Sequence, residues 1–310
     1  MLSSLQSEKK RRELNEKLIK YTLILAAAIS ILTTFGILFS ILFEAIEFFQ
    51  LRSFWYFLTG TIWSPGVANS QFGALPIFAG TFVITIIALL VAIPIGLGSA
   101  IYMSEYASSK LRDYLKPILE ILAGIPTVVY GFFAAITVAP LVVKAAAFFG
   151  LEATFNSALA SGIVMGIMII PLISSLSDDV IRAVPDSQRK AAFALGMTHG
   201  ETIKNIVIPS AMPGIISASL LALSRALGET MIVVMAAGLR PNLSWNPLED
   251  MTTVTVTIVN SLVGDFEFNS PETLSAFALG LVLFIVTLIL NMISLSLIRK
   301  FKEKYKVNTL

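Results

Sequence analysis

The chain has 310 residues, of which 56% are hydrophobic and 14% are charged, and its formal net charge is +2. Since a soluble domain is usually about 45 to 50% apolar, this composition predicts an integral membrane protein. The absence of cysteine excludes disulfides and thiolate metal sites, and a single histidine, His199, excludes a multi-histidine metal site. The small net charge gives no sign of a nucleic-acid partner.

The first 46 residues predict a basic cytoplasmic segment followed by a membrane span. The basic residues ahead of residue 21 are Lys9, Lys10, Arg11, Arg12, Lys17 and Lys20. The uncharged run from Tyr21 to Phe43 is too long for the apolar part of a signal peptide and long enough to cross a bilayer. We therefore expect residues 1–20 in the cytoplasm and the first transmembrane helix at 21–46.

Five further apolar runs predict a permease-like core over residues 74–298. Their expected spans are 75–103, 117–143, 153–177, 206–239 and 274–298. The run 117–143 contains the helix breaker Gly124-Ile125-Pro126. Such breaks are tolerated in a bilayer only against protein or a cavity, so this helix is a candidate pore wall. In the run 153–177, which is the fourth span of the chain, the small residues Ala158, Ser161, Gly162 and Gly166 predict close helix packing.

The connecting segments differ in charge, which predicts their side of the membrane. The outer segments 47–73 and 240–272 each hold one basic residue, whereas the inner segments 105–116 and 178–205 and the tail 299–310 are rich in lysine and arginine. Six spans with this bias place both termini in the cytoplasm. Within the second outer loop, residues 253–258 alternate as a strand does, but a short surface helix is equally consistent with them.

The run 206–239 contains two charges, Arg225 and Glu229, which lie on one face if the helix is continuous. Counting from Pro213 at 1.5 Å per residue places Arg225 about 18 Å into the span, near the bilayer centre. Charged residues there usually face a protein interior or an aqueous path and have a function. The alternative is that Glu229 only neutralises Arg225 and holds two helices in register.

The inner segment predicts two short helices joined at Gly196. Residues 188–196 have a helical pattern ended by glycine, and the pattern resumes at Glu201. Together they predict a compact knob, although an ordinary solvated connector remains open. The sequence contains no phosphate-cradling loop of the Walker A type, so any use of ATP must come from a partner. A membrane enzyme is disfavoured, because nucleophile and base must lie within hydrogen-bond reach and the residue inventory is poor.

The inner segment also resembles the EAA loop of ABC-importer permeases, which docks into a groove of the ATPase subunit. The resemblance is carried by Lys190, Ala191, Ala192, Gly196, Ile206 and Pro209, which match that motif in spacing. Lys190 replaces the family's glutamate, and Ile208 replaces a leucine.

Further stretches are similar to phosphate-specific permeases of the PstC type. They are Trp63-Ser64-Pro65, Phe72 to Pro76, Ser104-Glu105-Tyr106, Leu122 to Gly131 and Arg225 to Met231. The resemblance implies an all-α membrane protein with six transmembrane helices, a type I importer (MetI-like) core and cytoplasmic coupling helices in the loop 186–209. It also implies a non-enzymatic permease subunit in a prokaryotic inner membrane that imports inorganic phosphate.

The partners that the resemblance implies are a second, PstA-type permease, two PstB-type ATPase subunits that hold ATP and magnesium, a PstS-type phosphate-binding protein and membrane lipid. No cofactor is expected on this chain. The resemblance places Arg225 and Glu229, with Ser224 and Thr230, on the phosphate path. Sulfate and molybdate permeases carry a similar run, so another oxyanion is an alternative, as is an ATP-independent secondary transporter.

Overall fold

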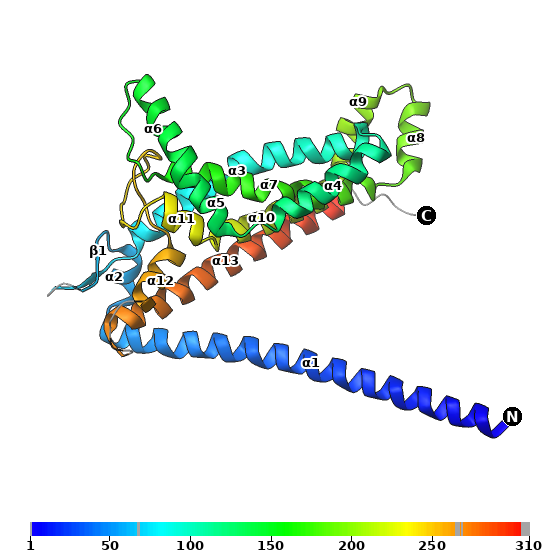
Figure 1. Cartoon of the computed structure of the whole chain (residues 1–310), viewed down its shortest axis with the longest axis horizontal. Helices are drawn as coiled ribbons and strands as arrows, with labels where there is room; N and C mark the ends of the chain where they lie inside the picture. The colour runs from blue at the N-terminus through cyan, green and yellow to red at the C-terminus, as the bar shows by residue number, and fades with distance from the viewer. Residues whose placement is uncertain (1, 67–68, 264–266, 268, 305–310) are drawn as a thin grey trace.

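The structure is a computed structural model that describes residues 2–66, 69–263, 267 and 269–304, and it is almost entirely helical (Figure 1). The first half contains α1 (Leu2–Leu51), α2 (Phe54–Thr59), β1 (Trp63–Ser64), β2 (Gln71–Phe72), α3 (Leu75–Ile101), η1 (Tyr102–Tyr106), α4 (Ser109–Ala123), α5 (Thr127–Phe133), η2 (Ala134–Val138) and α6 (Ala139–Phe148). The second half contains α7 (Ala158–Arg182), α8 (Asp186–Ala194), α9 (His199–Thr202), η3 (Ile203–Val207), α10 (Ile208–Leu227), α11 (Met231–Ala236), α12 (Val254–Val263) and α13 (Pro271–Lys304).

Within the described residues, six helices are long and apolar enough to cross a membrane, which confirms the predicted number. They are Asn15–Leu51, Leu75–Tyr106, Thr127–Phe148, Ala158–Arg182, His199–Leu227 and Pro271–Lys300. The first helix is longer at both ends than the predicted span. α1 begins and α13 ends at the end of the molecule where α8 and α9 lie, on the right of Figure 1.

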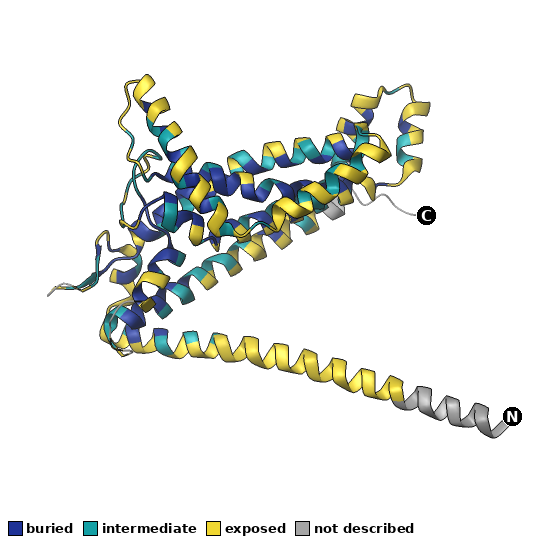
Figure 2. Cartoon of the chain, in the orientation of Figure 1, coloured by how far each residue is buried: buried dark blue, intermediate teal, exposed yellow. Residues whose placement is uncertain are grey.

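The core lies between α3 and α7, which pack along much of their length (Figures 1 and 2). The predicted small residues make this contact possible. A methyl group on Gly162 would lie 2.6 Å from Ile87 Cγ2, and one on Gly166 would lie 2.8 Å from the Ala88 carbonyl oxygen. Ile84 and Ile169 fill the centre of the core and are fully buried. The expectation of close packing by the fourth span is therefore confirmed.

α1 contributes little to the core of the isolated chain. Its outer end packs on α13, where Ala45 and Phe48 are fully buried. Most of its remaining length is exposed and extends away from the other helices (Figure 2). The antiparallel pair β1–β2 sits beside this outer end, with Trp63 opposite Phe72. Trp63 is only 9% exposed, so it belongs to this aromatic core.

The third predicted span, 117–143, is wrong at both ends. α4 ends at Ala123, Gly124 caps it, and the crossing helix starts at Thr127. Pro126 explains the break, because the ring disfavours helical geometry in the residue before it. α4 has no buried residue in the chain, as expected for a helix that carries several charges. At the other end the helix continues past the predicted end at residue 143 and stops at Phe148.

The segment 253–258 is helical, which decides between the two predicted alternatives. The side chains of Val254, Thr257 and Ser261 in α12 are buried, and their spacing of three and four residues is that of one helix face. The helix is not a surface element, because Thr81 Oγ1 of α3 accepts a hydrogen bond from the Val254 amide at 3.0 Å. α12 therefore closes the outer end of the core.

Candidate functional site: a charged helix break and an inner knob

The predicted single helix over residues 206–239 is broken at its charged motif. α10 ends at Leu227, Gly228 caps it, and α11 starts at Met231. Arg225 lies in the last turn of α10, whereas Glu229 lies in the connection that follows. The expectation that the two side chains share one helix face is therefore wrong. Each charge instead complements the dipole of the helix end beside it, the cation at a C-terminus and the anion at an N-terminus.

The Glu229 carboxylate holds the start of α11. Its Oε1 accepts hydrogen bonds from the amides of Met231 at 3.1 Å and Ile232 at 3.4 Å. The residue is 8% exposed, and its carbonyl oxygen accepts a hydrogen bond from Thr255 Oγ1 of α12 at 2.8 Å. Among the described residues Glu229 forms no ion pair with Arg225. The interpretation that Glu229 merely neutralises Arg225 has no support in this geometry.

Arg225 is exposed in the isolated chain. Its guanidinium lies within electrostatic range of Tyr130 in α5. The Tyr130 hydroxyl donates a hydrogen bond to the Leu122 carbonyl at 2.9 Å and so bridges the break at Gly124-Ile125-Pro126. The neighbouring Ser224 hydroxyl contacts Asn291 Oδ1 of α13 at 3.5 Å. A free guanidinium beside polar groups of two other helices can bind an anion.

The two broken helices pack directly on each other. A methyl group on Gly131 of α5 would lie 3.0 Å from the Met231 carbonyl oxygen and 2.9 Å from Met235 Sδ of α11. Only glycine permits this approach without a shift of the backbone or the thioether. The third crossing helix therefore lies against the charged break.

Arg225 and Ser224 thus lie in the last turn of α10, whereas Glu229 is buried and caps α11 through Oε1. Thr230 is the half-buried residue that precedes α11, and its side chain makes no capping hydrogen bond. Sequence reasoning did not identify Tyr130 or Asn291 as part of this region. Asn291 offered a signal, since it is a polar residue inside a charge-free apolar run.

The inner segment folds as the two short helices that the sequence predicted. Gly196 has a φ of +82°, and the amides of Gly196 and Met197 donate to the carbonyls of Phe193 and Ala192 at 2.9 and 3.1 Å. This pattern is a Schellman motif, which turns the chain at the end of α8. Thr198 and Glu201 then form a capping box that starts α9. We call α8 and α9, residues 186–202, the knob.

Four of the predicted ATPase-coupling residues lie in the knob, and Ile206 and Pro209 lie in η3 and α10, which follow it. Lys190, Ala191 and Gly196 are exposed, Ala192 is buried, and Ile206 and Pro209 are partly buried. Two large apolar side chains are also exposed on the knob, Phe193 at 46% and Leu195 at 80%. A surface with such side chains is typical of a protein contact.

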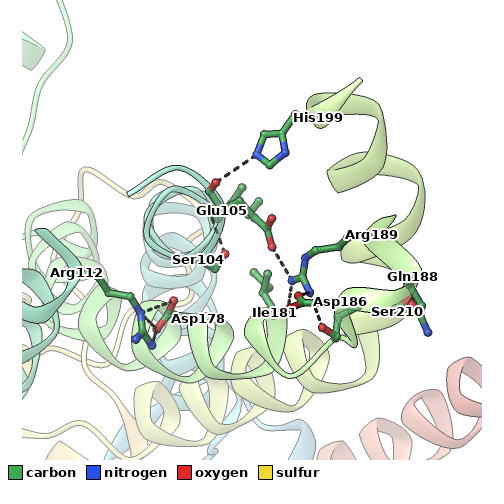
Figure 3. Close-up of polar contacts among 12 residues, drawn as sticks. Ser104, Glu105, Arg112, Asp178, Ile181, Asp186, Gln188, Arg189, His199 and Ser210 are labelled. Atoms are coloured by element: carbon green, nitrogen blue, oxygen red, sulfur yellow. Dashed lines mark hydrogen bonds and ion pairs between the residues drawn. The ribbon is translucent and has the colours of Figure 1, made fainter. Parts of the chain in front are cut away.

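Ion pairs fix the base of the knob and the neighbouring α4 (Figure 3). Arg112 of α4 binds the fully buried Asp178 of α7 with two nitrogens, the shorter distance being 2.6 Å. The hydrogen bond and charge of Asp178 raise the pKa of Arg112. Arg189 of α8 binds Glu105 of η1 at 2.8 Å. None of these pairs was predicted, because their members lie far apart in sequence.

Among the described residues no group of three or more histidine, cysteine or acidic side chains is arranged to hold a metal ion.

Comparison with known proteins identifies the family. Residues 92–306 match the family described as "Binding-protein-dependent transport system inner membrane component". The chain belongs to this family. Its members are multi-pass inner-membrane subunits of transport systems that use a separate binding protein, as the family's description implies.

Named relatives narrow the comparison. The chain is 35% identical over 251 residues to the probable ABC transporter permease protein YqgH of Bacillus subtilis, covering 81% of this chain and 78% of that protein. It is 35% identical to the phosphate transport system permease protein PstC of Mesorhizobium japonicum, with coverage of 86% and 84%. It is 31% identical to PstC of Haemophilus influenzae, with coverage of 93% and 94%.

Solved structures confirm the fold of a type I ABC-importer permease. A bacterial alginate ABC transporter aligns with a TM-score of 0.63 over 91% of this chain and 94% of that chain, at 15% identity. An inward-facing MetNI methionine transporter aligns with a TM-score of 0.54 over 74% of this chain and 94% of that chain, at 16% identity. At these identities the likeness concerns the fold alone.

Proposed function

We infer that this chain is the transmembrane permease subunit of an ATP-driven inorganic phosphate importer. The observation that carries the inference is the Arg225 guanidinium, which forms no ion pair with any described residue and lies near the break between two helices, in a chain whose relatives include PstC permeases. Broken helices with charged ends are how membrane transporters build substrate sites away from water. Arg225 and Ser224 line the phosphate path, and Thr230 borders it.

The chemistry of the site suits an oxyanion. A guanidinium holds two oxygens of one phosphate through parallel hydrogen bonds, which a lysine ammonium cannot do. Among the described residues only Oε1 of Glu229 has hydrogen-bond partners, so Oε2 is left to accept a hydrogen bond from a protonated phosphate oxygen. A carboxylate in that place repels sulfate, which has no proton to donate at neutral pH. Glu229 thus contributes both a cap and selectivity.

The knob is the surface on which the ATPase docks. Phe193 and Leu195 provide its apolar contact, and Lys190 and Ala191 lie beside them on the exposed side of α8. The assembly contains a second permease of the PstA type, two PstB-type ATPase subunits and a PstS-type binding protein. ATP and magnesium bind to the ATPase, and this chain needs no cofactor. The knob and both ends of the chain face the cytoplasm, in keeping with the basic residues there.

The test of this function is uptake of labelled phosphate by the assembled complex in vesicles supplied with ATP and binding protein. We expect ATP-dependent accumulation that excess arsenate suppresses and excess sulfate leaves unchanged. Equal suppression by sulfate or molybdate would reassign the substrate to another oxyanion. A complex purified under mild conditions that contains no ATPase, yet accumulates phosphate, would indicate a secondary transporter.

A further inference from the structure

The side chain of Glu105 has no part in the phosphate path described above, yet it is one of the most buried acidic groups at the inner end of the molecule. Its side chain is 5% exposed and lies in η1, the π-helical turn that directly continues α3. Its partner Arg189 belongs to the knob and is 16% exposed. A buried ion pair is weak support for stability, but it does fix how two elements sit relative to each other. This pair joins the knob to α3 (Figure 3).

Arg189 is held on several sides at once, so the joint is stiff. Besides Glu105, Nη2 donates to the Ile181 carbonyl at 3.0 Å, and Nη1 donates to the Val184 carbonyl. Nη1 also contacts Asp186 at the start of α8 at 3.3 Å. The guanidinium therefore connects α8 to the end of α7 and to η1. A planar fork bound in this way has little freedom to rotate.

A second contact links the same turn to α9. Nε2 of His199 lies 3.2 Å from the Glu105 carbonyl, to which it donates in the tautomer that carries its proton there. The His199 ring packs edge-on against Tyr106 of η1 and is stacked on Phe193 of α8. Both helices of the knob thus contact η1.

The elements that this joint connects lead to the phosphate path. α3 packs along α7, where a methyl group on Gly96 would lie 2.9 Å from the side chain of Ile173. On its other side, α8 contacts α10 through Gln188 Oε1 and the Ser210 hydroxyl at 3.1 Å. Ser210 is about 22 Å along α10 from Arg225, at 1.5 Å per residue. A displacement of the knob that moves both α3 and α10 changes the geometry around Arg225.

We propose that the Glu105–Arg189 ion pair is the link that makes α3 follow the knob, and that it sets how much phosphate is moved for each ATP hydrolysed. The proposal rests on the function proposed above, in which an ATPase acts on the knob. Glu105 and Arg189 are positioning residues, because they touch neither ATP nor phosphate. Without the ion pair the ATPase still docks and hydrolyses ATP, but only the contacts of His199 with η1 remain, so less of the movement of the knob reaches α3.

The test compares Glu105→Ala with Asp186→Ala in the reconstituted full complex. Both variants remove a carboxylate acceptor from Arg189, but Asp186 is 83% exposed and lies on α8 itself, so only Glu105→Ala cuts the contact with α3. We expect Glu105→Ala to keep at least half of the ATPase activity while phosphate transported per ATP falls at least five-fold. Asp186→Ala should stay within two-fold of the natural chain on both measures. An unchanged ratio in Glu105→Ala, or a parallel loss of both activities, would overturn the proposal.

Rescue separates a linking role from a folding role. Since the chain contains no cysteine, Glu105→Cys and Arg189→Cys can be combined and bridged by a short bifunctional thiol reagent. The unbridged double variant should be uncoupled, and bridging should restore at least half of the transport per ATP. Mass spectrometry should show that bridging is complete. If complete bridging restores no transport per ATP, the link does not couple ATP hydrolysis to phosphate transport.

A distance measurement tests, without reference to the substrate, whether the Glu105–Arg189 pair holds the knob at a fixed distance from α3. Spin labels on Ser187 of α8 and Ile95 of α3, both exposed positions, report the spacing between knob and α3. With Glu105 present, we expect one spacing that is the same with and without ATP. In Glu105→Ala the spacing should change when ATP is added. If the link holds by this measure while no phosphate is transported by the natural complex, the substrate is wrong and the link stands. An ATP-independent spacing in Glu105→Ala removes the link whatever the substrate.

Discussion

Arg225 and Glu229 are four residues apart, yet a helix end at Leu227 separates them, and the two side chains form no ion pair. Glu229 is bound to the amides of Met231 and Ile232, and in the proposed function the Arg225 guanidinium binds the substrate anion. In that function the separation matters, because a bidentate ion pair with Glu229 would occupy the hydrogen-bond donors of Arg225.

The capping role of Glu229 predicts a local loss of stability in Glu229→Ala. The variant leaves the amides of Met231 and Ile232 without their acceptor in a buried place, at a cost of about 1 to 3 kcal/mol. Amide hydrogen exchange in the assembled complex should be faster at these two residues, with little change in α7. Glu229→Gln, which keeps an acceptor, should exchange more slowly than Glu229→Ala. Equal exchange in all three chains would contradict the cap.

The close contact of α5 with α11 predicts that Gly131→Ala is harmful. The added methyl group meets the Met231 carbonyl oxygen at 3.0 Å, and overpacking of this kind costs about 1 to 3 kcal/mol. The thermal midpoint and the uptake of the complex should both fall. Gly98→Ala is the matched control, because nothing lies within 4 Å of a methyl group there. A helix interior gains up to about 1 kcal/mol from that change, so a harmful Gly98→Ala would undermine the comparison.

The buried Asp178 predicts that Arg112→Ala is more damaging than removal of both charges. Loss of Arg112 leaves a fully buried carboxylate without its cation, which costs about 3 to 5 kcal/mol. Adding Asp178→Asn to that variant removes the unpaired charge and should recover part of the loss in denaturation of the complex. If the double variant is less stable than Arg112→Ala alone, the pair does not behave as a buried ion pair.

The outer loop predicts a dependence on acid pH. Hydrogen bonds from Asn242, then Asn246, lower the pKa of Glu249 below its ordinary value of 4.5. A depressed folded pKa gives stability that is present above about pH 4.5 and is lost as the pH falls through the lowered value. The amides of residues 240–250 should therefore be less protected from exchange when the pH is below the lowered pKa of Glu249. In Glu249→Gln this dependence should be absent, and its persistence would assign it to another group.

The sequence predicted the fold well where one strong local signal acted. Long apolar runs predicted the number of spans, and Gly196 predicted the turn of the knob. The break at Gly228 was missed because apolar residues continue on both sides of it, and hydropathy does not report a change of helix axis. A signal was present, since a glycine followed by a glutamate before an apolar run is typical of one helix ending and another starting.

The contacts that define the site could not be predicted in the same way. Glu105 and Arg189 are 84 positions apart, and only the packing of α3 on α7 brings them together. Gly131 lets α5 approach Met231 and Met235 of α11, which is a property of three-dimensional packing and not of spacing. The pairing of charges across elements is therefore where the structure adds most to the sequence.

The most direct test of the central claim is phosphate uptake by complexes that carry Arg225→Lys or Arg225→Gln. Both variants should assemble and hydrolyse ATP, since Arg225 holds no ion pair that the fold needs. Uptake should fall at least ten-fold in Arg225→Lys, because an ammonium keeps the charge but cannot bind two oxygens in a fork, and Arg225→Gln should be inactive. Near-normal uptake in Arg225→Gln would show that phosphate does not pass by this residue.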